Sequence, residues 1–114
     1  HNAKGVMLIS LPSSKVNSAV PDERNHGCIN IPEKDFGCYF FENKVPITEC
    51  GFSFPFDTFV YAYWITDKTI ETINYIYNPK DYTLIGKLTN QEYLDVLNCL
   101  KHSPNIKSKY RKLL

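Results

Sequence analysis

The stretch GFSFPFDTFVYAYWITD, residues 51–67, holds seven aromatic side chains in seventeen positions. From residue 58 to 66 the side chains alternate between two faces. One face carries Phe59, Tyr61, Tyr63 and Ile65, and the other carries Val60, Ala62 and Trp64. Alternation of aromatic and β-branched residues with period two predicts a strand. Because both faces are apolar, we expect this strand to be central in its sheet, with both sides at least partly covered.

Short apolar runs separated by turn residues predict further strands on either side of this stretch. Residues 5–11 predict a first strand, and residues 28–44 predict a short strand, a turn and a second strand near 38–43. The alternation and the turn signals over 58–88 predict an antiparallel meander. The polar segment 12–27 contains two prolines and predicts a long loop.

A helix is predicted over about 90–102. Thr89 and Glu92 form the capping-box pattern Thr-x-x-Glu, in which each side chain bonds the backbone N–H of the other residue. An apolar stripe follows at helical spacing, made of Tyr93, Val96, Leu97 and Leu100, with Leu94 beside it and Cys99 at its edge. The predicted fold is therefore α+β, with one antiparallel sheet of about five or six strands packed by this C-terminal helix.

The C-terminal residues 104–114 predict a short second helical segment that is basic and amphipathic, with the apolar side chains Ile106, Tyr110, Leu113 and Leu114 on one face. We expect the whole chain, 1–114, to form a single domain in which residues 1–4 and 12–27 are flexible. With 43% hydrophobic and 22% charged residues, the composition is that of a globular protein. The apolar runs fall short of the roughly 20 residues that a membrane-spanning helix needs.

Charge is unevenly distributed along the chain. Residues 101–114 contain five basic side chains and no acidic one, whereas residues 1–100 contain eight basic and twelve acidic side chains. A nucleic-acid-binding domain needs a basic body, so this pattern argues against a nucleic-acid partner. An acidic body instead favours steering toward a basic protein, such as a toxin or an enzyme.

The four cysteines, Cys28, Cys38, Cys50 and Cys99, contain no C-x-x-C pair, which argues against a zinc site. Their even number favours two disulfides in a secreted or periplasmic protein. We favour Cys50–Cys99, which would fasten the helix to the sheet, together with Cys28–Cys38. Four cysteines allow three pairings, and four buried thiols in a cytosolic protein are the alternative interpretation.

The sequence contains no recognisable nucleophile, nucleotide-binding or metal-binding motif, so no metal or cofactor is expected. His26, in PDERNHG, lies beside two acidic residues and could serve as a general base. A polar loop without catalytic function explains the same residues. His26 is therefore only a weak catalytic candidate, and the sequence leans against an enzyme.

The aromatic residues, which include eight Tyr and seven Phe, exceed what one face of a sheet can bury. Tyrosine and tryptophan are enriched in protein interfaces. We therefore expect a partner-binding set made of Tyr61, Tyr63, Trp64, Tyr75 and Tyr77. The leading interpretation is a small disulfide-stabilised protein of the inhibitor or immunity type that occludes another protein. The alternatives are a small hydrolase or ribonuclease using His26, and an accessory subunit of a larger assembly.

Overall fold

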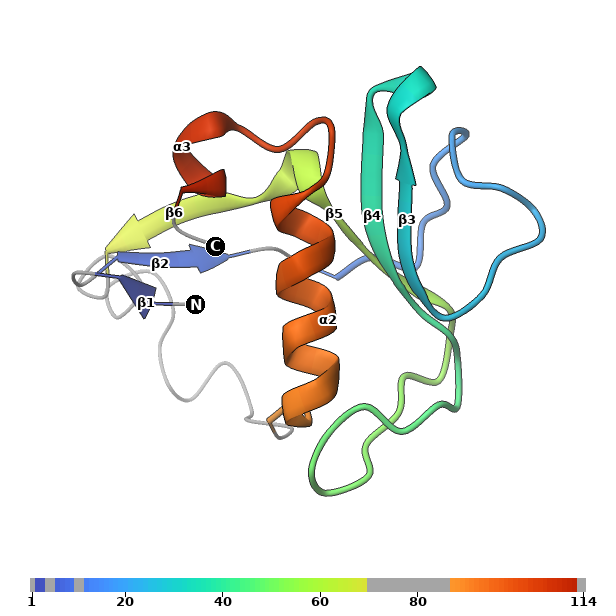
Figure 1. The fold of residues 1–114 in the computed structure, drawn as a ribbon. Coiled ribbons are helices and arrows are strands. Elements are labelled where there is room, and N and C mark those ends of the chain that lie inside the picture. Colours follow the sequence, from blue (N-terminus) through green and yellow to red (C-terminus); the bar gives the residue numbers. More distant parts are fainter. Residues whose placement is uncertain (1, 4–5, 10–11, 70–86, 113–114) are drawn as a thin grey trace.

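The computed structural model describes residues 2–3, 6–9, 12–69 and 87–112, and within these the fold is mixed α+β. The elements are β1 (Asn2–Ala3), β2 (Val6–Ile9), β3 (Gly27–Ile31), the 3-10 helix η1 (Pro32–Lys34), β4 (Phe36–Phe41), β5 (Thr58–Tyr61), the 3-10 helix η2 (Ala62–Trp64), β6 (Thr66–Thr69), α2 (Asn90–Lys101) and α3 (Ser108–Arg111). The strands form two antiparallel sheets of three strands each, ordered β1-β2-β6 and β3-β4-β5 (Figure 1).

The α+β class is confirmed, but one sheet of five or six strands is wrong for the described residues. The predicted strand over 58–66 is interrupted by η2, a single 3-10 turn. Before this turn the chain pairs with β4, and after it the chain pairs with β2, where Asp67 lies opposite Leu8 and Lys68 opposite Met7. The turn therefore sends the two halves of the stretch into different sheets. The rest of the predicted meander, 70–86, lies outside the described residues.

Both faces of the sheet β3-β4-β5 are covered, because the side chains of β4 and β5 alternate between two cores. The helix-side core contains Tyr39, Phe41, Val60 and Ala62 together with Cys99 and Leu100 of α2 and Tyr110 of α3. The loop-side core contains Cys38, Phe40, Phe59 and Tyr61 together with Val20 of the segment 12–26. The predicted coverage of both faces is confirmed, but the central strand is β4. Among the described residues, the outer edge of β5 bonds only Ser13, through an isolated bridge at Phe59.

Helix α2 begins where the sequence predicts, and Thr89 Oγ1 accepts the backbone N–H of Glu92 at 3.2 Å. The reciprocal bond of the capping box is not formed: the Thr89 N–H donates to the carbonyl of Ile47, and the Glu92 side chain turns toward β3 and β4. In the predicted apolar stripe, Leu100 is buried, whereas Tyr93 at the stripe's N-terminal end is exposed.

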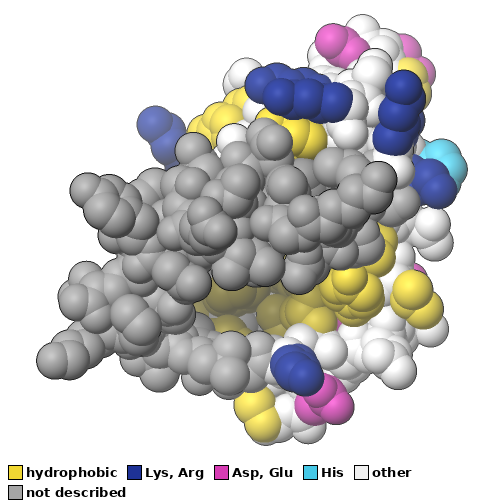
Figure 2. Space-filling model, turned by 90° about the vertical axis from the view of Figure 1, so that its left-hand side faces the viewer, with side chains coloured by type: hydrophobic (Ala, Val, Ile, Leu, Met, Phe, Trp, Pro, Cys, Tyr) yellow, Lys and Arg dark blue, Asp and Glu magenta, His cyan; other side chains and the backbone are white. Residues whose placement is uncertain are grey.

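Helix α3 is a single turn that lies against the C-terminal end of α2 (Figure 1). Ile106 and Tyr110 are buried in the helix-side core. Arg111 bonds the carbonyls of Lys101 and Ser103 with its guanidinium group. Figure 2 shows Lys and Arg side chains along the upper edge of the face on which β1, β2 and β6 lie. The described part of the tail thus packs its apolar side chains into the fold, and its basic side chains are exposed, although Arg111 also bonds the end of α2.

One disulfide, Cys28–Cys99, joins β3 to α2 across 71 residues of sequence. The expected pairs Cys50–Cys99 and Cys28–Cys38 are wrong, and Cys38 and Cys50 are thiols in the structure. The register of the β3–β4 hairpin explains part of this result. Cys28 lies opposite Tyr39, so its side chain is on the helix side, whereas Cys38, one residue earlier in β4, points into the loop-side core.

Candidate functional site: an aromatic surface and a polar hollow

Two aromatic side chains of η2 are exposed next to each other. Tyr63 and Trp64 are 37% and 44% exposed, and their ring centroids lie 5.3 Å apart in an edge-to-face arrangement. Two further apolar side chains, Val16 and Phe56, are also exposed and line one surface depression. The segment holding Val16 reaches η2 through Asn17, whose amide donates to the Tyr63 hydroxyl at 3.3 Å. Because no contact joins Phe56 to η2 among the described residues, we call the adjacent Tyr63 and Trp64 rings alone the aromatic surface.

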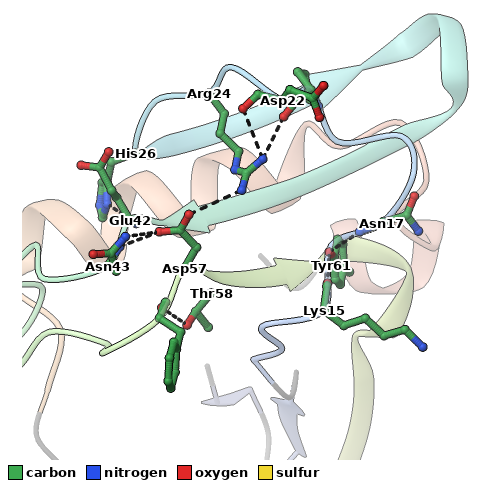
Figure 3. A network of polar contacts seen from close by, with 12 residues as sticks. Lys15, Asn17, Asp22, Arg24, His26, Glu42, Asn43, Asp57, Thr58 and Tyr61 are labelled. Carbon is green, nitrogen blue, oxygen red and sulfur yellow. Dashed lines mark hydrogen bonds and ion pairs between the residues drawn. The ribbon is translucent and has the colours of Figure 1, made fainter.

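Tyr61 supports this surface from below instead of forming part of it. Its side chain is buried, and both exposed rings of η2 contact it, at centroid distances of 5.6 Å for Tyr63 and 5.2 Å for Trp64. The Tyr61 hydroxyl donates to the carbonyl of Lys15 and accepts the N–H of Asn17 (Figure 3). Burial raises the pKa of this hydroxyl. Of the predicted partner-binding set, Tyr61 is therefore in the core, and Tyr75 and Tyr77 lie outside the described residues.

Arg24 attaches the segment 12–26 to the sheet. Its guanidinium carbon lies 5.1 Å from the Phe40 ring centroid and 5.3 Å from that of Phe59, within the range of cation–π contacts. The guanidinium also donates to the carbonyl of Pro21 and pairs with Asp57 at 3.4 Å (Figure 3). These contacts hold the segment that carries Val16 against the strands beneath it.

Asp57 gives this attachment a pH dependence. The side chain and backbone N–H groups of Asn43 donate to Asp57 Oδ1, and with Arg24 nearby they lower the pKa of the carboxyl group. Because folding lowers the pKa of Asp57, its ionised carboxylate stabilises the native state at pH values above the pKa in the unfolded chain, about 3.9. This stabilisation is lost as the pH falls through the lower pKa of the folded state. We expect Asp57→Asn to be less stable than wild type at about pH 6 and to lose less stability on acidification to about pH 3.

Urea unfolding at the two pH values measures this difference. Asn43→Ala removes the strongest cause of the shift, so its pH profile should approach that of Asp57→Asn. Parallel profiles for wild type and both variants would show that Asp57 does not couple folding to protonation.

A polar hollow of about 510 Å³ lies between α2 and β3, on the other side of the sheet from the loop-side core. Two histidines and two carboxylates line it: His26, His102, Glu92 and Asp95. Tyr39, Asn30, Asn98 and the Cys28–Cys99 disulfide complete its wall. Among the described residues, no Lys or Arg lines the hollow. It is therefore a site with two carboxylates and no strong permanent cation.

His26 is held in one tautomer by its two neighbours. The backbone N–H of Glu42 donates to His26 Nδ1 at 3.0 Å, so the ring proton is on Nε2, which donates to the Glu92 carboxylate at 3.0–3.1 Å. The Tyr39 hydroxyl donates to the same carboxylate. Burial, and then the neighbouring Glu92, raise the pKa of Tyr39. Glu92 thus accepts from two neutral donors, one on the residue just before β3 and one in β4.

This arrangement bears on the hydrolase or ribonuclease interpretation of His26. A general base needs an unprotonated nitrogen that faces the substrate, and Nδ1 of His26 is occupied by the Glu42 N–H. The ring would have to leave one of its bonds to act as a base. Within the described part of the chain, no group of three His, Cys, Asp or Glu residues is arranged to hold a metal ion.

Sequence reasoning named His26 but missed its partners. Glu92 is 66 residues away and was assigned to the capping box, and Tyr39 was counted only among the aromatic residues. The spacing of Glu92 and Asp95, three residues apart on a helix, does place both carboxylates on one face. Only the fold shows that this face meets β3.

Comparisons of the chain with protein-family models, with curated proteins and with solved structures found no significant match. In the part of the chain that the structure describes, no helix has the length and apolar character needed to cross a membrane.

Proposed function

We propose that this protein is a secreted or periplasmic, disulfide-stabilised module that binds and occludes another protein, as an inhibitor or immunity-type protein does. The observation that carries the proposal is the exposure of the adjacent Tyr63 and Trp64 rings on a turn whose base is fixed by the buried Tyr61.

Exposed rings on a fixed base suit binding for two physical reasons. Trp and Tyr are enriched among the residues that contribute most to protein–protein affinity, since each buries a large area. A turn that is already ordered loses little conformational entropy when a partner covers it. The bonds from Tyr61 to Lys15 and Asn17 supply that order here.

The disulfide and the charge distribution support the rest of the proposal. A disulfide persists in an oxidising compartment and is rare in the cytosol, which fits a secreted or periplasmic protein. The acidic excess of residues 1–100 favours a basic partner, such as a toxin or an enzyme, because opposite charge raises the rate of encounter.

The double variant Tyr63→Ser/Trp64→Ser should bind the partner more weakly by about 2 kcal/mol, roughly a thirty-fold higher Kd, because it removes both rings of the aromatic surface. The partner is first isolated on immobilised wild-type protein from the fluid or extract in which the protein occurs. Its affinity for each variant is then measured by calorimetry.

Leu94→Ser is the matched control. Leu94 is 53% exposed, but it lies on α2, which packs on the opposite side of the sheet from the segment 12–26. This variant should bind like wild type. Equal affinity of the double variant and wild type would refute the role of the aromatic surface.

A further inference from the structure

We infer that the polar hollow is a second binding site, independent of the aromatic surface, and that it binds a guanidinium cation. The inference rests on Glu92, Asp95 and the tautomer of His26, and it does not depend on the proposed function.

The first step is the charge of Glu92. Its side chain is only 11% exposed, and the groups that bond it are the Nε2–H of His26 and the hydroxyl of Tyr39. Because the Glu42 N–H occupies Nδ1, His26 is a neutral donor in this arrangement. No Lys or Arg pairs with Glu92 among the described residues. A largely buried carboxylate without a counter-ion is costly, and a cation in the hollow would compensate it.

The second step is the position of Asp95. It lies one helical turn after Glu92 and lines the same hollow, so both carboxylates face one space. Asp95 Oδ1 accepts the side-chain amide of Gln91 at 2.8 Å, which orients the carboxylate without neutralising it. His102 also lines the hollow. Its Nδ1–H donates to the carbonyl of Asn98, so this proton forms a hydrogen bond within the helix.

The third step is the shape of the cation. A guanidinium group is planar, carries five N–H donors in a rigid fork and is less strongly hydrated than an ammonium group. The donors of one guanidinium group can bond two carboxylates at once, which is what the side chains of Glu92 and Asp95, three residues apart on α2, require. The volume of about 510 Å³ is within the range of small-ligand sites and admits an arginine side chain.

The probe is Nα-acetyl-arginine N-methylamide, titrated into ¹⁵N-labelled protein and followed by NMR. We expect saturable shift changes at residues that line the hollow, with a Kd on the order of 1 mM. The Nα-acetyl-citrulline N-methylamide control has the same shape without the charge and should give no saturable shifts. Agmatine, a free guanidinium compound, distinguishes the two sources. Agmatine also carries an ammonium group, so a capped residue that binds at least as tightly as agmatine indicates an arginine side chain of a protein, whereas binding of agmatine alone indicates a small molecule.

Asp95→Asn should weaken binding about three- to five-fold, because one carboxylate loses its charge while Oδ1 can still accept from Gln91. Glu33→Gln removes the same charge from the exposed helix η1 and should leave the Kd unchanged. Tyr63→Ser/Trp64→Ser should also leave it unchanged, so that this site and the aromatic surface can fail separately. Equal binding of the citrulline probe, or arginine-probe shifts that avoid the hollow, would overturn the inference.

Discussion

Replacing Cys28 and Cys99 together by serine should lower the free energy of unfolding by about 4 kcal/mol, the chain-entropy value for a closed loop of this size. The bridge spans 71 residues and connects β3, at the edge of its sheet, to the C-terminal half of α2. Without it, the unfolded chain gains conformational freedom and α2 is held to the sheet by packing and hydrogen bonds alone. Because a domain has only about 5–15 kcal/mol of stability, this loss is large.

Urea unfolding with and without reductant measures the effect. Reductant should destabilise the wild type to the level of the double variant and should leave the double variant unchanged. Cys50→Ser is the control, since Cys50 is exposed and is a thiol in the structure. It should keep the full response to reductant. If the wild type has the same free energy of unfolding with and without reductant, the Cys28–Cys99 pairing is contradicted.

Gly37→Ala should destabilise the protein by about 3 kcal/mol, at the upper end of the range for overpacked sites. Gly37 lies in β4, and a Cβ atom there would come within 1.9 Å of Ser103 Oγ, 2.7 Å of Ser103 Cβ and 2.4 Å of Asn30 Oδ1. Ser103 is fully buried just after α2 and cannot move without shifting its backbone. The added methyl group must therefore separate the end of α2 from the sheet.

Two comparisons isolate the steric cause in thermal or urea unfolding. Gly51→Ala adds the same methyl group with nothing within 4 Å, but at a φ of +86°, so it should cost about 1 kcal/mol through backbone strain. Adding Ser103→Gly to Gly37→Ala should restore part of the loss, because it removes the two Ser103 atoms. If Gly37→Ala costs no more than Gly51→Ala, the close approach of Ser103 to β4 is wrong.

Local patterns predicted the elements that depend on neighbouring residues. Thr89 marks the start of α2 because an N-cap acts within three residues of sequence. The apolar character of both faces of the stretch from Thr58 reflects the two cores on either side of β5. The turn at Ala62–Trp64 could not be predicted in this way, since Tyr and Trp favour strands and the alternation continues through them.

The parts of the candidate sites that the sequence did not predict depend on long-range geometry. The register that places Cys28 opposite Tyr39 determines which cysteine faces α2, and turn residues between β3 and β4 do not reveal it. His26 and Glu92 meet only because α2 packs across β3. In sequence, Tyr61 resembles its neighbours Tyr63 and Trp64. In the structure Tyr61 ends β5 and is buried, whereas Tyr63 and Trp64 lie in the 3-10 turn η2 and are exposed.

Hydroxyl-radical footprinting of the protein with its isolated partner tests the central claim most directly, because it reports the solvent exposure of individual side chains. On complex formation, oxidation of Tyr63 and Trp64 should fall strongly, while oxidation of the exposed Leu94 on α2 should stay unchanged. Undiminished oxidation of Tyr63 and Trp64 in the complex would contradict the claim that these rings are the surface through which this protein occludes another.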